Sequence, residues 1–226
     1  MISSRTEFLA GLRAVAPILL GVVPFALITG IAAVEAKLPT GLAIASSILI
    51  FAGASQLAAT QLIRENGAFV VIILTVLIIN LRFAMYSVSL APHFKRLASS
   101  WKGLLAYLLT DQAYALSIIR YNEVPQHPAK QWFYLGAAAG LWVTWQTGTI
   151  VGVLVGAQIP SNWSLDFAIP LTFIAVTVPA IKGRRALIVA TVSVLVAVTA
   201  AGLPYNLGLI VAGLVGVFTG IILEAI

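Results

Sequence analysis

Eight apolar runs follow one another along the chain, separated by short polar or proline-containing connections. They cover residues 12–34, 41–63, 68–91, 103–119, 132–157, 164–181, 186–201 and 204–224. A helix needs about 20 apolar residues to cross the hydrocarbon core of a bilayer, and most of these runs approach that length. Only 9% of the residues are charged, which leaves too little polar surface to coat a soluble globule. We therefore predict an all-α, polytopic integral membrane protein with seven or eight apolar helical segments, forming a single transmembrane domain over residues 1–226.

Charge counting leaves two topologies open. The loop lysines and arginines divide eight to four between the two faces if all segments cross, and also if segments 41–63 and 164–181 are broken or re-entrant. A weak internal similarity bears on this choice, because a Gly-rich helix followed by Phe-Ala and a break occurs in residues 21–56 and again in 148–170. In the second topology these units would be inverted, as in many secondary transporters. The sequence thus allows an inverted repeat with two broken or re-entrant segments.

Arg82 and Asp111 lie deep inside apolar runs, where a charge costs at least about 3 kcal/mol. Arg82 is ten residues before Pro92 and Asp111 is nine after Lys102, so both lie about 13–15 Å along a helix from the connection between them. Antiparallel neighbours would bring the guanidinium and the carboxylate to one level, where each lowers the cost of burying the other. The pair predicts a charge switch used in transport; the alternatives are a structural bond between helices, or an Arg82 that extends to the interface.

Three polar residues near the middle of the first runs are candidates for binding a substrate. Ser55 and Gln56 follow small residues in segment 41–63, and Asn80 precedes Arg82 by two positions. A discontinuous helix there would expose backbone N–H or C=O groups to the carboxylate and amine of a small zwitterion. The alternative is that the small residues only permit close helix approach.

The second half of the chain offers two tryptophans and one further carboxylate. Trp142 and Trp145 lie within one apolar run and could pack on an apolar side chain of a substrate, or be ordinary packing residues. Asp166 begins the next run, where it could take part in proton coupling or favour a helix start through the helix dipole.

Several classes of function are excluded or disfavoured. The absence of cysteine excludes disulfides and thiolate metal sites. No metalloprotease, nucleophile-elbow or phosphate-loop signature is present, so we expect no enzyme, no cofactor, no metal and no ATP-driven step. The net charge of +6 indicates loops facing anionic membrane lipid rather than a nucleic-acid partner. Transport would then depend on an ion gradient or the membrane potential, with Asp111 as the best intramembrane proton carrier by residue type.

Four blocks of sequence, in order, resemble the AzlC family, the large subunits of branched-chain amino-acid exporters in bacteria and archaea. The blocks are Phe51-Ala-Gly-Ala-Ser-Gln56, Asn80-Leu-Arg82 with Tyr86-Ser-Val-Ser-Leu-Ala-Pro92, Leu109-Thr-Asp111, and Leu165-Asp-Phe-Ala168. The resemblance covers nearly the whole chain and includes Ser55, Gln56, Asn80, Arg82, Asp111 and Asp166 as motif matches. Family members commonly have Thr-Asp-Glu where this chain has Thr110-Asp111-Gln112, which leaves Asp111 as the one candidate for proton coupling in that block.

The resemblance implies export of small apolar, branched-chain amino acids across the cytoplasmic (inner) membrane of a prokaryote by a multi-pass secondary transporter. It also implies a separate, small hydrophobic subunit of the AzlD type as a partner. Two other functions compete with this expectation. A channel for ions or small neutral solutes would share the polar midplane but would not need alternating access. A structural scaffold for a catalytic partner would bind no solute itself.

Overall fold

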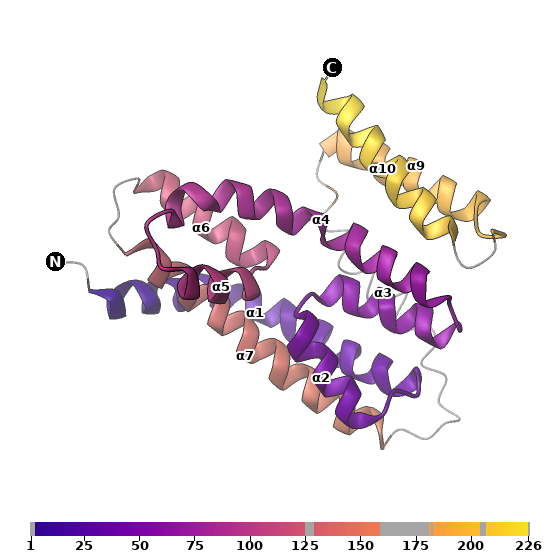
Figure 1. Cartoon of the computed structure of the whole chain (residues 1–226), viewed down its shortest axis with the longest axis horizontal. Helices are drawn as coiled ribbons and strands as arrows, with labels where there is room; N and C mark the ends of the chain where they lie inside the picture. The colour runs from indigo at the N-terminus through magenta and orange to yellow at the C-terminus, as the bar shows by residue number, and fades with distance from the viewer. Residues whose placement is uncertain (1–2, 125–128, 159–180, 182, 204–206, 226) are drawn as a thin grey trace.

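All regular secondary structure is helical in the described residues, 3–124, 129–158, 181, 183–203 and 207–225, of the computed structural model. Within these residues, four helices, α1, α4, α7 and α10, are long and apolar enough to cross a membrane. The all-α membrane fold predicted from the sequence is therefore confirmed, while segment 164–181 lies outside the described residues apart from its last position. Figure 1 shows the arrangement of α1 (Ser4–Glu35), α2 (Thr40–Ile50), α3 (Gly53–Arg64), α4 (Phe69–Phe94), α5 (Ser99–Tyr107), α6 (Asp111–Glu123), α7 (Lys130–Gly156), α9 (Gly183–Thr199) and α10 (Leu207–Ala225).

Helices α1 and α7 form the central pair, and they run in the same direction. A Cβ atom added to Gly11 would lie 2.0 Å from the carbonyl oxygen of Phe133, and one added to Gly30 would lie 2.3 Å from that of Thr149. The contacting residue numbers rise together along both helices, which makes the pair parallel. Small residues let the two backbones touch, the usual way of packing helices without a hydrophobic driving force.

The segment predicted at 41–63 is broken and re-entrant. We call the end of the molecule where α1 begins the near end, and the other the far end. From the far end, α2 enters the interior and stops at Phe51, whose positive φ of 32° turns the chain. Helix α3 begins at Gly53 and returns to the far end, where Arg64 pairs with Glu35 at 3.5 Å.

A second re-entrant pair enters from the opposite end. Helix α4 runs from the far end to the near end, α5 turns back into the interior, and α6 leads out again until Arg120 meets Glu7 at 3.4 Å. The predicted single segment 103–119 is therefore wrong, because the chain breaks at residues 108–110. No glycine or proline marks this break, which lies inside an apolar run of the sequence.

The two units α1–α3 and α4–α6 have opposite orientations. Each has one long helix followed by a re-entrant pair, and in Figure 1 the pairs α2–α3 and α5–α6 enter from opposite ends. The inverted arrangement allowed by the sequence is thus present, but its second copy was misassigned. The sequence matched the α1 region with residues 148–170, whereas α7 runs parallel to α1 and the inverted copy is α4–α6.

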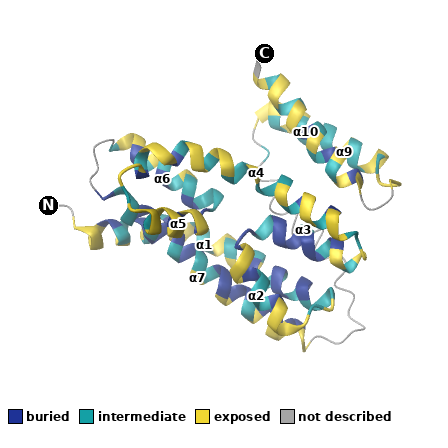
Figure 2. Ribbon diagram, in the orientation of Figure 1, coloured by how far each residue is buried: buried dark blue, intermediate teal, exposed yellow. Residues whose placement is uncertain are grey.

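Helices α9 and α10 pack mainly against each other, and α10 also contacts α4. Figure 2 shows that the buried residues gather on α1, α3 and α7, whereas α4, α9 and α10 are largely exposed or intermediate. Large apolar side chains make up much of the exposed surface of α4, including Phe69, Leu77 and Met85. Such a surface is suited to lipid tails or to other membrane helices rather than to water.

Candidate functional site

The two re-entrant pairs meet at a cavity of about 290 Å³, which is near the lower end of the roughly 300–1,000 Å³ typical of small-ligand pockets. We call residues 51–53 the first tip and residues 108–111 the second tip. Both tips line the cavity, and α1, α4 and α7 supply the other walls. The lining residues are Ile18, Gly21, Val22, Phe25, Phe51, Ala52, Gly53, Ala54, Arg82, Phe83, Thr110, Asp111, Gln112, Leu141 and Trp145.

Arg82 and Asp111 form an ion pair in the wall of this cavity. Arg82 Nη1 lies 2.8 Å from Asp111 Oδ2, and the two side chains are 32% and 37% exposed. In the part of the chain that the structure describes, Arg82 Nε and Asp111 Oδ1 are buried without a hydrogen-bond partner. About a third of each side chain remains exposed beside an open space, so a solute in the cavity could reach the pair.

Arg82 and Asp111 lie at the same depth in the helix bundle for a different reason from the one predicted. The sequence suggested antiparallel neighbours, but α4 and α6 run parallel: Tyr86 stacks on Tyr114 at 4.3 Å, and the Tyr114 hydroxyl donates to Ser89 at 3.1 Å. The nine residues of α5 first carry the chain back by about 13 Å, so α6 begins level with Arg82.

Asp111 is the first residue of α6 rather than part of a continuous transmembrane helix. The Thr110 side chain caps this helix by accepting a hydrogen bond from the Ala113 amide at 3.2 Å. A carboxylate in the first turn is favoured by the helix dipole, which adds to the effect of Arg82. The Thr-Asp sequence is a typical helix start, and this signal could have located the break.

The first tip brings a second helix start to the same cavity. Gly53 opens α3 against an aromatic wall made by Phe25 and Trp145, whose rings meet edge to face at 5.3 Å. A Cβ on Gly53 would lie 2.5 Å from Trp145 and 2.7 Å from Phe25, so only glycine fits there. The first amides of a helix have no acceptor in a preceding turn and attract negative charge.

Ser55, Gln56 and Asn80 lie together behind the first tip and do not line the cavity. The Ser55 hydroxyl donates to the Ala52 carbonyl at 2.9 Å and accepts from Asn80 Nδ2 at 3.1 Å. Gln56 Nε2 donates to the Ser46 hydroxyl at 3.3 Å. Ser55 and Gln56 are fully buried. These bonds fasten α3 to α2 and α4, so in this structure the three side chains hold the first tip in place.

The two predicted tryptophans occupy different positions. Trp145 is buried and lines the cavity, whereas Trp142 donates through Nε1 to the Tyr107 hydroxyl at 2.9 Å. Tyr107, which sequence reasoning missed, donates in turn to the Ile48 carbonyl at 2.6 Å and so joins α5 to α2. Tyr107 carries no sequence signal that separates it from an ordinary interfacial tyrosine. The third predicted residue of this half, Asp166, lies outside the described residues.

The site offers a cation, an anion and an apolar wall within one cavity. Arg82 and the two helix starts favour a carboxylate, Asp111 favours an ammonium group, and Phe25, Phe51 and Trp145 favour an apolar side chain. Among the described residues, no group of three His, Asp or Glu side chains could hold a metal ion. The cation, the anion and the apolar wall together suit the binding of a small zwitterion.

The fold and site define an integral membrane protein with a polar site between opposed broken helices. Its sequence places it in a known group: the profile of the family described as AzlC protein matches residues 17–159, and the chain belongs to that family. It is 27% identical to Inner membrane protein YgaZ of Escherichia coli (strain K12), over 95% of this chain and 90% of that protein. It is also 29% identical to an "Uncharacterized membrane protein" of Archaeoglobus fulgidus, over 81% of this chain and 80% of that protein. No solved structure matches.

Proposed function

We propose that this protein exports branched-chain amino acids across the cytoplasmic (inner) membrane of a prokaryote in exchange for protons. Membership of the AzlC family supports a membrane-transport role, and the name of the Escherichia coli relative supports the inner membrane. The observation that carries the proposal is the Arg82–Asp111 pair, which lies at 2.8 Å in a cavity bounded by two opposed helix breaks. Binding sites of secondary transporters are commonly built from such discontinuous helices.

The ion pair suggests how one site could serve both substrate and proton. A bound amino acid would present its carboxylate to Arg82 and its ammonium group to Asp111, so each charge of the pair would exchange its partner for a group of the substrate. The aliphatic side chain would then lie against Phe25 and Trp145, whose rings line the same cavity. An apolar wall of this kind favours leucine, isoleucine and valine over polar amino acids by a few kcal/mol at most.

Exchange follows from competition at Asp111. An ionised Asp111 attracts the ammonium group of the substrate, whereas a proton on Asp111 removes that attraction and leaves Arg82 unpaired. Substrate and proton therefore exclude each other from the site, which is the requirement for antiport. Because exchange needs the site to face each side in turn, a change of access at the tips completes the cycle.

The proposal includes a small hydrophobic membrane subunit of the AzlD type as partner. The exposed apolar surfaces of α4, α9 and α10 support this, because they leave room for further helices beside lipid. Coexpression with and without the small subunit, followed by assays of resistance to toxic leucine analogues, tests the partnership. Resistance that is the same without the small subunit would remove it from the proposal.

The central experiment compares Asp111→Asn with the wild-type protein in proteoliposomes. We expect leucine movement driven by a pH gradient to fall by roughly tenfold or more, which corresponds to about 1.4 kcal/mol of lost coupling. Leucine counterflow should persist at a raised KM, because asparagine still accepts a hydrogen bond from the ammonium group. Wild-type counterflow itself separates a carrier from a channel, since a channel gives no trans-stimulation.

The matched control is Glu35→Gln, which makes the same carboxylate-to-amide change in the ion pair at the far end. It should leave pH-driven leucine transport unchanged. If Asp111→Asn retains full pH-driven flux, Asp111 has no role in coupling and the proposed exchange with protons is wrong.

A further inference from the structure

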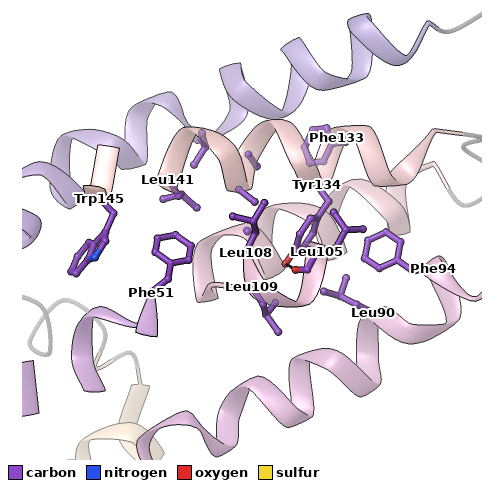
Figure 3. Packing of buried hydrophobic residues seen from close by; sticks show 14 of the residues in the cluster. Phe51, Leu90, Phe94, Leu105, Leu108, Leu109, Phe133, Tyr134, Leu141 and Trp145 are labelled. Atoms are coloured by element: carbon purple, nitrogen blue, oxygen red, sulfur yellow. Dashed lines mark hydrogen bonds between the residues drawn. The ribbon is translucent and has the colours of Figure 1, made fainter. Parts of the chain in front are cut away.

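A second cavity, of about 360 Å³, opens at the near end between α4 and α5. It shares no lining residue with the cavity between the tips, although Leu109 of the second tip borders it, and it is lined mainly by apolar side chains. Figure 3 shows Leu90 and Phe94 on one side, Leu105 and Leu109 on the other, and Tyr134 of α7 beside them. Ser87, two lysines and the Tyr134 hydroxyl, which already donates to the Leu105 carbonyl, add polar groups to the lining. The lining is therefore suited to a hydrocarbon chain and poorly suited to a polar solute.

Lys95 and Lys102 lie on opposite sides of this cleft, one just after α4 and the other in α5. Both are exposed, and within the described part of the chain neither forms an ion pair. None of the described residues that line the cleft is acidic. The two ammonium groups thus form an uncompensated positive charge at one end of an apolar space, which favours a ligand with a negative head and an apolar body.

The level of the lysines in the membrane can be judged from neighbouring tryptophans. Trp101, adjacent to Lys102, meets Trp132 edge to face at 5.1 Å at the near end. Tryptophan is enriched at the headgroup level of bilayers, and basic residues at that level attract anionic lipid. From there the cleft extends toward Leu109 at the second tip.

We infer that an anionic phospholipid binds in this cleft, with one acyl chain between α4 and α5 and its phosphate between Lys95 and Lys102. Lysine recognises a phosphate as a compact point charge and needs no fixed geometry. The site does not depend on the transport proposal. A bound lipid would nevertheless affect the second tip, because it would fill the space between α4 and α5. Leu105 is the only buried residue of α5, so α5 has few other contacts that fix its position.

The test is binding of defined lipids to the purified protein, measured by native mass spectrometry in detergent. Phosphatidylglycerol should bind more tightly than phosphatidylcholine with identical chains. The double variant Lys95→Gln, Lys102→Gln should bind phosphatidylglycerol about 25-fold more weakly, at about fivefold per lysine. The matched control Arg184→Gln, Arg185→Gln removes two exposed charges from α9 and should leave binding unchanged.

A second variant tests the apolar part of the site. Ala106→Phe fills the cleft while keeping both lysines, and it should abolish phosphatidylglycerol binding. Leu104→Phe makes a similar change on the exposed side of α5, outside the lining, and should not affect binding. Equal binding of the two lipids would overturn the inference. So would a lysine variant no weaker than the arginine control, or full binding by Ala106→Phe.

Discussion

The two re-entrant pairs reach the same cavity, but the first helix of each pair is fastened very differently. The first pair is held by buried polar contacts: Gln146 Oε1 accepts from the Ser47 hydroxyl at 3.0 Å, and Gln146 Nε2 donates to the Ser47 carbonyl at 3.2 Å. Asn80 adds a bond from α4 to Ser55. In the second pair, α6 is also held by polar contacts, Arg120 with Glu7 at 3.4 Å and the Tyr121 hydroxyl donating to the Lys130 carbonyl at 2.7 Å. By contrast, α5 has one buried residue, Leu105, whose carbonyl accepts from the Tyr134 hydroxyl at 2.9 Å.

This difference indicates which side of the cavity can move. Breaking the first pair away from α7 would leave several buried polar groups unsatisfied, and each such group costs about 1–3 kcal/mol. Moving α5 would expose little new apolar surface, since most of α5 is already exposed. We therefore expect the first tip to act as a fixed wall and α5 to supply the change of access in transport.

The largest effect is expected from Gly53→Val at the first tip. The added side chain would overlap the packed rings of Trp145 and Phe25, and overpacking of this kind costs about 1–3 kcal/mol. A fixed wall cannot yield, so the melting temperature in detergent should fall and leucine counterflow should be lost.

The matched control is Gly21→Ala, which lines the same cavity but whose new Cβ would have no atom within 4 Å. It should stabilise α1 by about 0.5–1 kcal/mol. Equal melting temperatures for the Gly53 and Gly21 variants would contradict the idea of a rigid first tip.

An intermediate effect is expected from Gln146→Leu, which removes the partner of Ser47 in α2. The Ser47 hydroxyl would then be buried without this bond, at a cost of about 1–3 kcal/mol. The double variant Ser47→Ala, Gln146→Leu removes both partners and should recover part of that loss. The coupling free energy from this double-mutant cycle measures how firmly the first pair is held, and a value near zero would argue against the proposed difference between the pairs.

Much of the site could be predicted from the sequence because charge inside an apolar run is conspicuous. Arg82 and Asp111 could be singled out by depth alone, and the break near Phe51 by the small residues that follow it. The break at 108–110 could not be found by hydropathy, since Leu108 and Leu109 continue the apolar run. Only the capping pattern of Thr110 before Asp111 marks it.

The packing of helices that are far apart in the sequence was harder to predict. Glycines at positions 136, 140, 148, 152 and 156 predict a smooth helix face, but they do not say which helix packs on it or in which direction. The parallel contact of α1 with α7 depends on backbone fit along both helices. For that reason an inverted repeat could be predicted from the sequence, but its second unit was placed on the wrong helix.

The smallest effect on stability, and the sharpest test of the second tip, is expected from Tyr107→Phe. The lost hydroxyl donates to the Ile48 carbonyl near the end of α2 and so joins α5 to α2. Because Tyr107 is 40% exposed, water can replace this bond, and the loss in free energy of unfolding should not exceed about 1 kcal/mol. Because this bond links α5 to α2, we expect the rate of leucine counterflow to change several-fold more than the melting temperature implies. Trp142→Phe is the control, since it removes the other partner of the Tyr107 hydroxyl and leaves the link between α5 and α2. A Tyr107→Phe variant whose counterflow rate matches that of Trp142→Phe would mean that the contact between α5 and α2 does not govern access, and the motion would have to be sought elsewhere in the molecule.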